Sequence, residues 1–218
     1  MTEKFHEDLV QLKSDIVKMG QLANDMLCGA VAALKNQDKE QANFILANKD
    51  KILDMDDEIE RKALELLTLY QPMGGDIRTI GASLKIITYL TRVGRYGKDI
   101  AKIAIELSIE PPLAKLVSIP FMQKKVCEML SDVLDAYSTA KLTKINPESI
   151  TERDNDIDAL RYSIFRECIS YMMEDPRNIS RCANYVMVAR YLERCGDHAC
   201  KIAEKVHYMV NGKRVEIS

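Results

Sequence analysis

Residues 191–203 read YLERCGDHACKIA, and residues 89–101 read YLTRVGRYGKDIA. The two stretches share Tyr, Leu, Arg, Gly, Ile and Ala at six of thirteen aligned positions. Each belongs to a long proline-free run in which apolar residues recur every three or four positions, the spacing of a helix with one buried face. The chain therefore carries an internal repeat, and each copy includes a long helix.

The prolines divide the rest of the chain into helices, because a proline inside a helix costs about 3 kcal/mol. They stand at residues 72, 111, 112, 120, 147 and 176. One more break is expected at 36–38, the sequence Asn-Gln-Asp, where the apolar pattern pauses. We expect six helices, near residues 4–36, 38–70, 76–108, 118–144, 147–173 and 177–211.

Long helices with short connections lie antiparallel to their neighbours in the chain. The prediction is therefore an all-α protein of two tandem three-helix bundles with an internal pseudo-twofold repeat. The first bundle is expected to span residues 1–110 and the second residues 115–218. With only 9 Gly and 6 Pro in 218 residues, the composition disfavours a turn-rich β fold.

Charge and composition exclude several classes of protein. The net charge is −2, from 31 basic and 33 acidic residues, so we expect no nucleic-acid partner. The N-terminal stretch MTEKFHEDL lacks the apolar core of a signal peptide, and no apolar run is long enough to span a membrane. We expect a cytoplasmic protein whose six cysteines, which form no CxxC pair, are free thiols.

Pairs of carboxylates four residues apart are the main chemical feature. Two carboxylates at this spacing share one helix face and repel each other unless a cation lies between them. Their oxygen atoms suit ions such as Mg²⁺, Mn²⁺, Fe or Ni²⁺. The alternative is a solvated charged face, since Glu193 and Asp197 are expected to lie opposite the apolar stripe of their helix, exposed to solvent. The pairs are Asp56/Glu60, Asp154/Asp158 and Glu193/Asp197.

Two other groups of residues have the types of side chain that bind metal ions. Cys195 and His198 lie one turn apart near Cys182 and Cys200, which makes zinc conceivable, but one straight helix cannot surround an ion with four ligands. Glu-x-x-His pairs at 3–6 and 204–207 are typical of di-iron bundles, but the other inward carboxylates of such a site are not clearly supplied.

Three segments identify a family. The stretch LERCGDHACKIAE at 192–204 resembles the signature LERIGDxAxNIAE of the PhoU family of phosphate-uptake regulators. The stretch YMMEDPR at 171–177 is similar to the segment that precedes this helix in the second PhoU repeat. Gln-Pro at 71–72, followed by Asp-Ile-Arg at 76–78, resembles the corresponding junction of the first repeat. The resemblance covers essentially the whole chain.

The resemblance implies a protein of two three-helix bundles that is not an enzyme. It implies a negative regulator that restrains the phosphate ABC transporter through its ATPase subunit, and so meets the membrane only through the transporter. It also implies possible relay to a sensor histidine kinase, and a homodimer. Some members bind metal clusters through E/D-x-x-x-D motifs on the second and third helices of each bundle.

Carried over residue by residue, this pattern places a metal site in the second bundle. Both motifs are present there, as Asp154 with Asp158 and Glu193 with Asp197. The resemblance leaves the metal open among Fe, Zn, Ni, Mn and Mg. Arg190 and Arg194 lie close to Glu193 in the sequence, and Asp197 can pair with Lys201, which favours the solvated face. Compared with the first bundle, we nevertheless expect these carboxylates to be unopposed by arginine.

The first bundle keeps one motif only, Asp56 with Glu60, which is a weaker partial site. Thr91 and Arg95 stand where the family has its acidic pair. A guanidinium can neutralise a neighbouring carboxylate without a cation. The prediction is an asymmetric protein, with a metal-competent second bundle and an arginine-substituted first bundle.

Two other functions remain open at this stage. One is a di-metal carboxylate enzyme on a helical bundle, which requires four inward carboxylates and two well-placed histidines. The expected exposure of Glu193 and Asp197 argues against it. The other is a regulatory subunit of a different ion transporter, which would act in trans.

Overall fold

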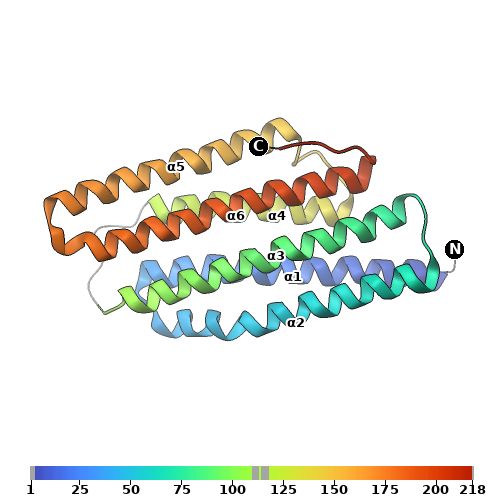
Figure 1. Ribbon diagram of the computed structural model, residues 1–218, viewed down its shortest axis with the longest axis horizontal. Coiled ribbons are helices and arrows are strands. Elements are labelled where there is room, and N and C mark those ends of the chain that lie inside the picture. Colours follow the sequence, from blue (N-terminus) through green and yellow to red (C-terminus); the bar gives the residue numbers. More distant parts are fainter. Residues whose placement is uncertain (1–2, 110–112, 114–117, 218) are drawn as a thin grey trace.

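The computed structural model describes residues 3–109, 113 and 118–217. Within these ranges the chain forms six long helices and no strand, which confirms the all-α class with two three-helix bundles (Figure 1). The helices are α1 (Glu3–Asn36), α2 (Lys39–Tyr70), α3 (Gly75–Leu107), α4 (Ser118–Thr139), α5 (Pro147–Glu174) and α6 (Ile179–Asn211). A short 3₁₀ turn, Pro176–Asn178, precedes α6.

Most helix boundaries agree with the expected ones and have local causes. The Asp38 side chain accepts a hydrogen bond from the backbone N of Gln41 at 2.9 Å and begins α2. Asn146 does the same for Ser149 at 2.8 Å, and Pro147 follows as the first residue of α5. The breaks expected at prolines 111 and 112 lie outside the described residues.

The predicted helix 118–144 is too long. α4 ends at Thr139, and Ala140 adopts a left-handed backbone with φ of 56°. Glycine usually takes this conformation at a helix end, so an alanine there was not recognisable as a stop. Residues 140–146 instead form the connection to α5.

The six helices form two layers. In one layer α1 packs against α2 and α3, and in the other α4 and α5 pack against α6 (Figure 1). The layers meet through the α3–α6 and α1–α4 contacts. As a result α6 lies against three helices, α3, α4 and α5, and retains only a narrow face towards solvent.

Aromatic stacking between α3 and α6 follows the internal repeat. Tyr89 stacks on His198 with ring centroids 5.6 Å apart, and Tyr96 stacks on Tyr191 at 5.4 Å. In the alignment of the two repeats, position 89 corresponds to 191 and position 96 to 198. Each stack is therefore the repeat-related copy of the other, as a local twofold axis between α3 and α6 requires.

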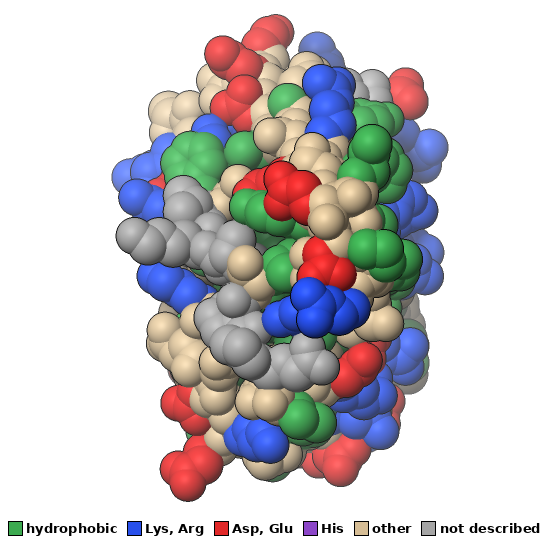
Figure 2. All heavy atoms as spheres, turned by 90° about the vertical axis from the view of Figure 1, so that its left-hand side faces the viewer, with side chains coloured by type: hydrophobic (Ala, Val, Ile, Leu, Met, Phe, Trp, Pro, Cys, Tyr) green, Lys and Arg blue, Asp and Glu red, His purple; other side chains and the backbone are tan. Residues whose placement is uncertain are grey.

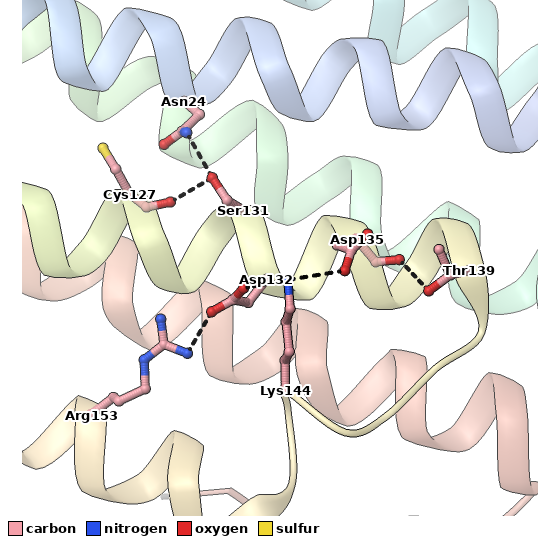
Figure 3. Close-up of polar contacts among 8 residues, drawn as sticks. All are labelled: Asn24, Cys127, Ser131, Asp132, Asp135, Thr139, Lys144 and Arg153. Carbon is pink, nitrogen blue, oxygen red and sulfur yellow. Dashed lines mark hydrogen bonds and ion pairs between the residues drawn. The ribbon is translucent and has the colours of Figure 1, made fainter.

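Polar contacts tie α4 to its surroundings (Figure 3). Asp132 accepts a hydrogen bond from Arg153 of α5 at 3.0 Å and forms an ion pair with Lys144 at 3.5 Å. At the preceding residue of α4, the Asn24 amide of α1 donates to the Ser131 hydroxyl at 3.4 Å. These contacts link α4 to both layers and to the connection that follows it.

The expectation of six free thiols is wrong for one pair. Cys28 of α1 and Cys127 of α4 form a disulfide, and the Gln123 amide nitrogen lies 3.1 Å and 3.0 Å from their sulfur atoms. The two cysteines are 99 residues apart, and only the packing of α1 on α4 brings them together. The other four are free and buried, at positions 168, 182, 195 and 200.

The surface of the described part shows no sign of a membrane span or of a basic end face. None of the described helices combines the length and apolar character needed to cross a bilayer. At the end of the molecule seen in Figure 2, acidic, basic and hydrophobic side chains lie side by side.

Candidate metal centre

The four carboxylates predicted in the second bundle lie on α5 and α6 and influence one another electrostatically. Burial is the largest cause that raises the pKa of Asp154, and Asp197 and Asp158 raise it further by like-charge repulsion. Burial likewise raises the pKa of Asp197, with Asp158 adding to it. Helix α5 thus supplies two carboxylates and α6 supplies the facing ones, as the motif spacing predicted.

The expected exposure of the α6 carboxylates is wrong for Glu193. Its side chain is buried, with 8% of the residue exposed, whereas the Asp197 side chain is 39% exposed. The reasoning from a single apolar stripe failed because α6 has three helical neighbours. Burial, followed by repulsion from Asp197, raises the pKa of Glu193.

The expectation that no arginine opposes these carboxylates is wrong. Arg190 donates a hydrogen bond to Glu193 Oε1, and the Arg161 Nε lies 3.8 Å from the same oxygen. Arg194 lies 3.4 Å from Asp197 Oδ2. Arg161 was missed because it lies on α5, although its position one turn after the Asp154/Asp158 pair could have suggested the contact.

One oxygen of the group is left without a partner. Glu193 Oε2 is buried and accepts no hydrogen bond from any described residue. Leaving a buried carboxylate oxygen unpaired costs free energy that a bound cation would recover. Oxygen donors are the ligands that a hard cation prefers, but no three His, Cys, Asp or Glu side chains among the described residues stand close enough to hold a metal ion, so the metal site stays a prediction.

Gly196 helps to place one of these donors. A Cβ atom at this position would lie 3.3 Å from Asp154 Oδ1 and 3.3 Å from the Ile157 side chain. Because glycine has no side chain, α5 and α6 approach closely and the Asp154 carboxylate lies directly over the α6 backbone. The glycine of the signature segment thus has a packing role beside the carboxylates.

The first bundle holds a different group at the equivalent place. Burial raises the pKa of Asp56, and Asp57 and Glu60 raise it further, while the Thr91 hydroxyl and Arg95 lower it. Thr91 Oγ1 is buried and makes no hydrogen bond of ordinary geometry with a described residue. Arg95 is the smallest of these influences and forms no ion pair with a described residue, so neutralisation of this carboxylate pair by arginine stays a prediction.

The Glu-x-x-His pair at the end of α6 serves the fold. Glu204 Oε1 accepts hydrogen bonds from Lys201 at 2.7 Å and from the backbone N of Ile217 at 3.2 Å. His207 Nε2 is hydrogen-bonded to the Ile145 carbonyl at 2.6 Å. Both side chains hold neighbouring segments in place, so they do not supply the histidine and carboxylate of a di-metal enzyme.

The Cys and His residues of α6 likewise do not form a zinc site in the described structure. Cys195 is fully buried in the apolar core, with 0% exposed. The His198 ring is stacked against Tyr89 and Tyr96 of the other bundle. Burial, with Arg92 and Arg194 adding to it, lowers the pKa of His198 to about 4.

Comparison with known proteins gives one consistent result. The PhoU domain family matches residues 16–104 and again residues 119–206. A phosphate-specific transport system accessory protein PhoU homolog of Caulobacter vibrioides is 38% identical over 98% of this chain and 92% of its own length. The homolog of Clostridium acetobutylicum is 36% identical over the full length of both chains.

Solved structures agree with this result. The crystal structure of PhoU from Pseudomonas aeruginosa superposes with a TM-score of 0.89 at 33% identity, covering 96% of this chain and all of the other. The structure of the phosphate transport system regulatory protein PhoU from Streptococcus pneumoniae superposes with a TM-score of 0.87 at 28% identity, covering 97% of this chain and 99% of the other.

Proposed function

Since the chain belongs to the PhoU family, we propose that it is an accessory regulator of phosphate transport that acts by protein–protein contact. The observation that carries this proposal is the match of both repeats, over nearly the whole chain, to proteins named for that role. The proposal includes three finer elements: restraint of uptake, contact with the ATPase subunit of the phosphate ABC transporter, and relay to a sensor histidine kinase.

An exposed apolar stripe on α5 supports a contact with the ATPase subunit. Tyr162, Phe165, Ile169 and Met173 recur at intervals of three or four residues, and between 39% and 81% of each residue is exposed. Such a stripe on one helix face is typical of a surface that packs against a partner.

The stripe continues the line of the candidate metal centre. At 100° per residue, the α5 positions 154, 158, 162, 165, 169 and 173 fall on one side of the helix. The N-terminal half of this side bears carboxylates and the C-terminal half bears apolar groups. A partner that covers the apolar half would therefore also meet the charge of the carboxylate half.

This arrangement supports modulation of partner binding by a metal. The residues that would hold it are Asp154, Asp158, Glu193 and Asp197, whose oxygen-only donor set suits Mg²⁺, Mn²⁺ or Fe better than zinc. When bound, the ion would supply positive charge that compensates the mutual repulsion of the carboxylates. In the metal-free protein, part of that repulsion would be offset by the guanidinium groups of Arg161, Arg190 and Arg194.

The test measures binding of the purified chain to the purified ATPase subunit of its phosphate transporter. We expect Phe165→Glu combined with Met173→Glu to weaken binding about a hundredfold, since two apolar anchors are replaced by charges. Phe44→Glu is the matched control, because Phe44 is exposed to a similar degree but lies on α2. Absence of binding by the unaltered chain, or equal binding by all three, would sink the proposal.

A cellular readout completes the test. Deletion of the chain should raise phosphate uptake when phosphate is plentiful, and re-expression should restore the restraint. The double variant on α5 should fail to restore it, while Phe44→Glu should succeed. Unchanged uptake after deletion would count against a regulatory role in phosphate transport.

A further inference from the structure

A second site lies away from the carboxylates. A pocket of about 620 Å³ opens where the N-terminal half of α3, the C-terminal half of α6 and the segment after α6 meet. Its volume falls within the range of sites for small molecules. Four of its lining side chains are basic, Lys85 from α3, Lys201 and Lys205 from α6, and Arg214 from the terminal segment.

The acidic groups of the pocket do not cancel this charge. Glu204 is buried, and it holds Lys201 at 2.7 Å, Lys205 at 3.8 Å and the backbone N of Ile217 at 3.2 Å. The hydrogen bond from Lys201 to Glu204 raises the pKa of Lys201, which keeps its ammonium group protonated. With Glu216 as the other carboxylate, four positive charges face two negative ones.

Two of the basic side chains have no acidic partner among the described residues. Among the described residues, neither Lys85 nor Arg214 forms an ion pair, whereas Lys201 and Lys205 share Glu204. Lys85 and Arg214 come from different elements, Lys85 from α3 in the first bundle and Arg214 from the segment after α6. Burial of Ile217, with 1% exposed, anchors that segment and so holds the Arg214 wall in place.

The pocket lining leaves room beside the α3 backbone at Gly81. A Cβ atom built on Gly81 would have no heavy atom within 4 Å, so this position opens into free space. Tyr208 lines the pocket and adds a hydroxyl group. The walls thus combine ammonium groups, a guanidinium and a hydroxyl around an open volume, which is the donor set that recognises phosphate oxygens.

We propose that this pocket binds a small anion through a phosphate group, held between Lys85 of α3, Lys201 and Lys205 of α6, and Arg214. The ligand would bridge the two bundles, since α3 belongs to one and α6 to the other. It would give the chain a direct response to phosphate or to a phosphorylated metabolite. The proposal is independent of the ATPase-subunit contact and of the carboxylate site.

Isothermal titration calorimetry of the full chain, at constant ionic strength set with chloride, tests this proposal. Inorganic phosphate, pyrophosphate and ATP serve as three separate probes. We expect at least one of them to bind, and Lys85→Gln to weaken that binding about tenfold through loss of a charge-assisted hydrogen bond. Lys102→Gln is the matched control, because it removes the same charge from α3 outside the pocket.

A steric variant separates the pocket from general electrostatics. Gly81→Leu fills the free space without changing the charge, and we expect it to abolish binding. Circular dichroism and thermal unfolding check that each variant is folded. If only inorganic phosphate binds, the ligand is the free ion. If only the larger probes bind, the ligand is a phosphorylated metabolite. Both results support the site.

Three results would overturn the proposal. These are no binding of any probe to the unaltered chain, equal weakening by Lys85→Gln and Lys102→Gln, and unchanged binding by folded Gly81→Leu. Each can occur while the ATPase-subunit contact stays intact, so failure of this site is distinguishable from failure of the proposed regulatory function.

Discussion

The two repeats share a framework but differ in the chemistry of one face. In both, a carboxylate motif on the middle helix faces the third helix, and the aromatic stacks between α3 and α6 obey the same local symmetry. At the facing positions the second repeat has Glu193 and Asp197, whereas the first has Thr91 and Arg95. A duplicated fold can thus keep its packing while its chemistry changes at two residues.

Arginine has a different place in each repeat. In the first, Arg95 stands in place of a carboxylate and is the smallest influence on the pKa of Asp56, which burial raises overall. In the second, Arg190 and Arg194 surround intact carboxylates and leave Glu193 Oε2 buried without a hydrogen-bond partner among the described residues. The second face thus keeps a buried oxygen that a cation could take, whereas in the first face the surroundings as a whole still raise the pKa of Asp56.

The largest expected effect comes from exchanging the two faces. Thr91→Glu combined with Arg95→Asp should destabilise the metal-free protein by about 3 kcal/mol, because Thr91 is only 7% exposed and the new charges adjoin Asp56. Urea unfolding with EDTA present measures this loss. Added Mn²⁺ should recover part of it by binding at the new site.

The reciprocal variant is the control for this exchange. Glu193→Thr with Asp197→Arg should bind less Mn²⁺ than the unaltered chain and should gain no stability from it. If the forward exchange leaves stability and Mn²⁺ response unchanged, the two residues do not account for the difference between the repeats.

A smaller expected effect is a dependence of the unfolding free energy on pH, which arises at a position where the two repeats differ. Position 198 is a histidine where the first repeat has Tyr96, and burial lowers the pKa of His198 to about 4 from 6.5. Between these values the unfolded chain binds a proton that the folded chain does not, so the unfolding free energy decreases as the pH falls from about 6.5 towards 4. Above about pH 6.5 the full stability is present.

His198→Gln should reduce this dependence. From pH 7 to pH 5, the unaltered chain should lose about 2 kcal/mol more unfolding free energy than the variant, measured by urea unfolding. Tyr96→Phe, which changes the partner ring without adding or removing a group that titrates in this range, should lose as much as the unaltered chain. Parallel pH curves for the unaltered chain and His198→Gln would contradict the assignment.

The smallest effect concerns the glycines of the two faces. Gly94→Ala would place a Cβ atom 2.4 Å from the end of the Ile52 side chain, and it should cost about 1 kcal/mol after the gain in helix propensity. Gly196→Ala meets Asp154 and Ile157 at 3.3 Å and should change stability by only a few tenths of a kcal/mol.

The two glycine variants should rank in the opposite order in their effect on Mn²⁺ binding. Gly196→Ala displaces the Asp154 carboxylate and should weaken Mn²⁺ binding, while Gly94→Ala should not. Thermal unfolding and Mn²⁺ titration of the two variants measure both effects. A larger loss of stability in Gly196→Ala than in Gly94→Ala would show that the packing around the two glycines has been misassigned.

Much of the fold follows from local patterns in the chain. Apolar spacing and the caps at Asp38 and Asn146 determine where helices run and begin, so their number and order were predictable. The end of α4 was not, since Ala140 takes a left-handed conformation that its residue type does not indicate. Likewise, no local pattern pairs Cys28 with Cys127, which meet only when α1 packs on α4.

The positions of the four carboxylates on their helices were predictable, but their surroundings were not, and cation binding by this group stays a prediction. Spacing alone placed Asp154 and Asp158 on one face of α5 and Glu193 and Asp197 on one face of α6. The burial of Glu193 depends on how many helices surround α6, and its contact with Arg161 depends on a second helix. Both are tertiary properties, which a helical projection of one segment does not contain.

The most direct test of the asymmetry between the repeats is an Mn²⁺ titration of the metal-free protein by calorimetry. The unaltered chain, Asp197→Asn and Asp56→Asn are compared in the same buffer. The account predicts that Asp56→Asn keeps the affinity of the unaltered chain, and that Asp197→Asn lowers it about tenfold or more through loss of a negatively charged ligand. Equal affinity in the unaltered chain and Asp197→Asn, or equal losses in both variants, would contradict it.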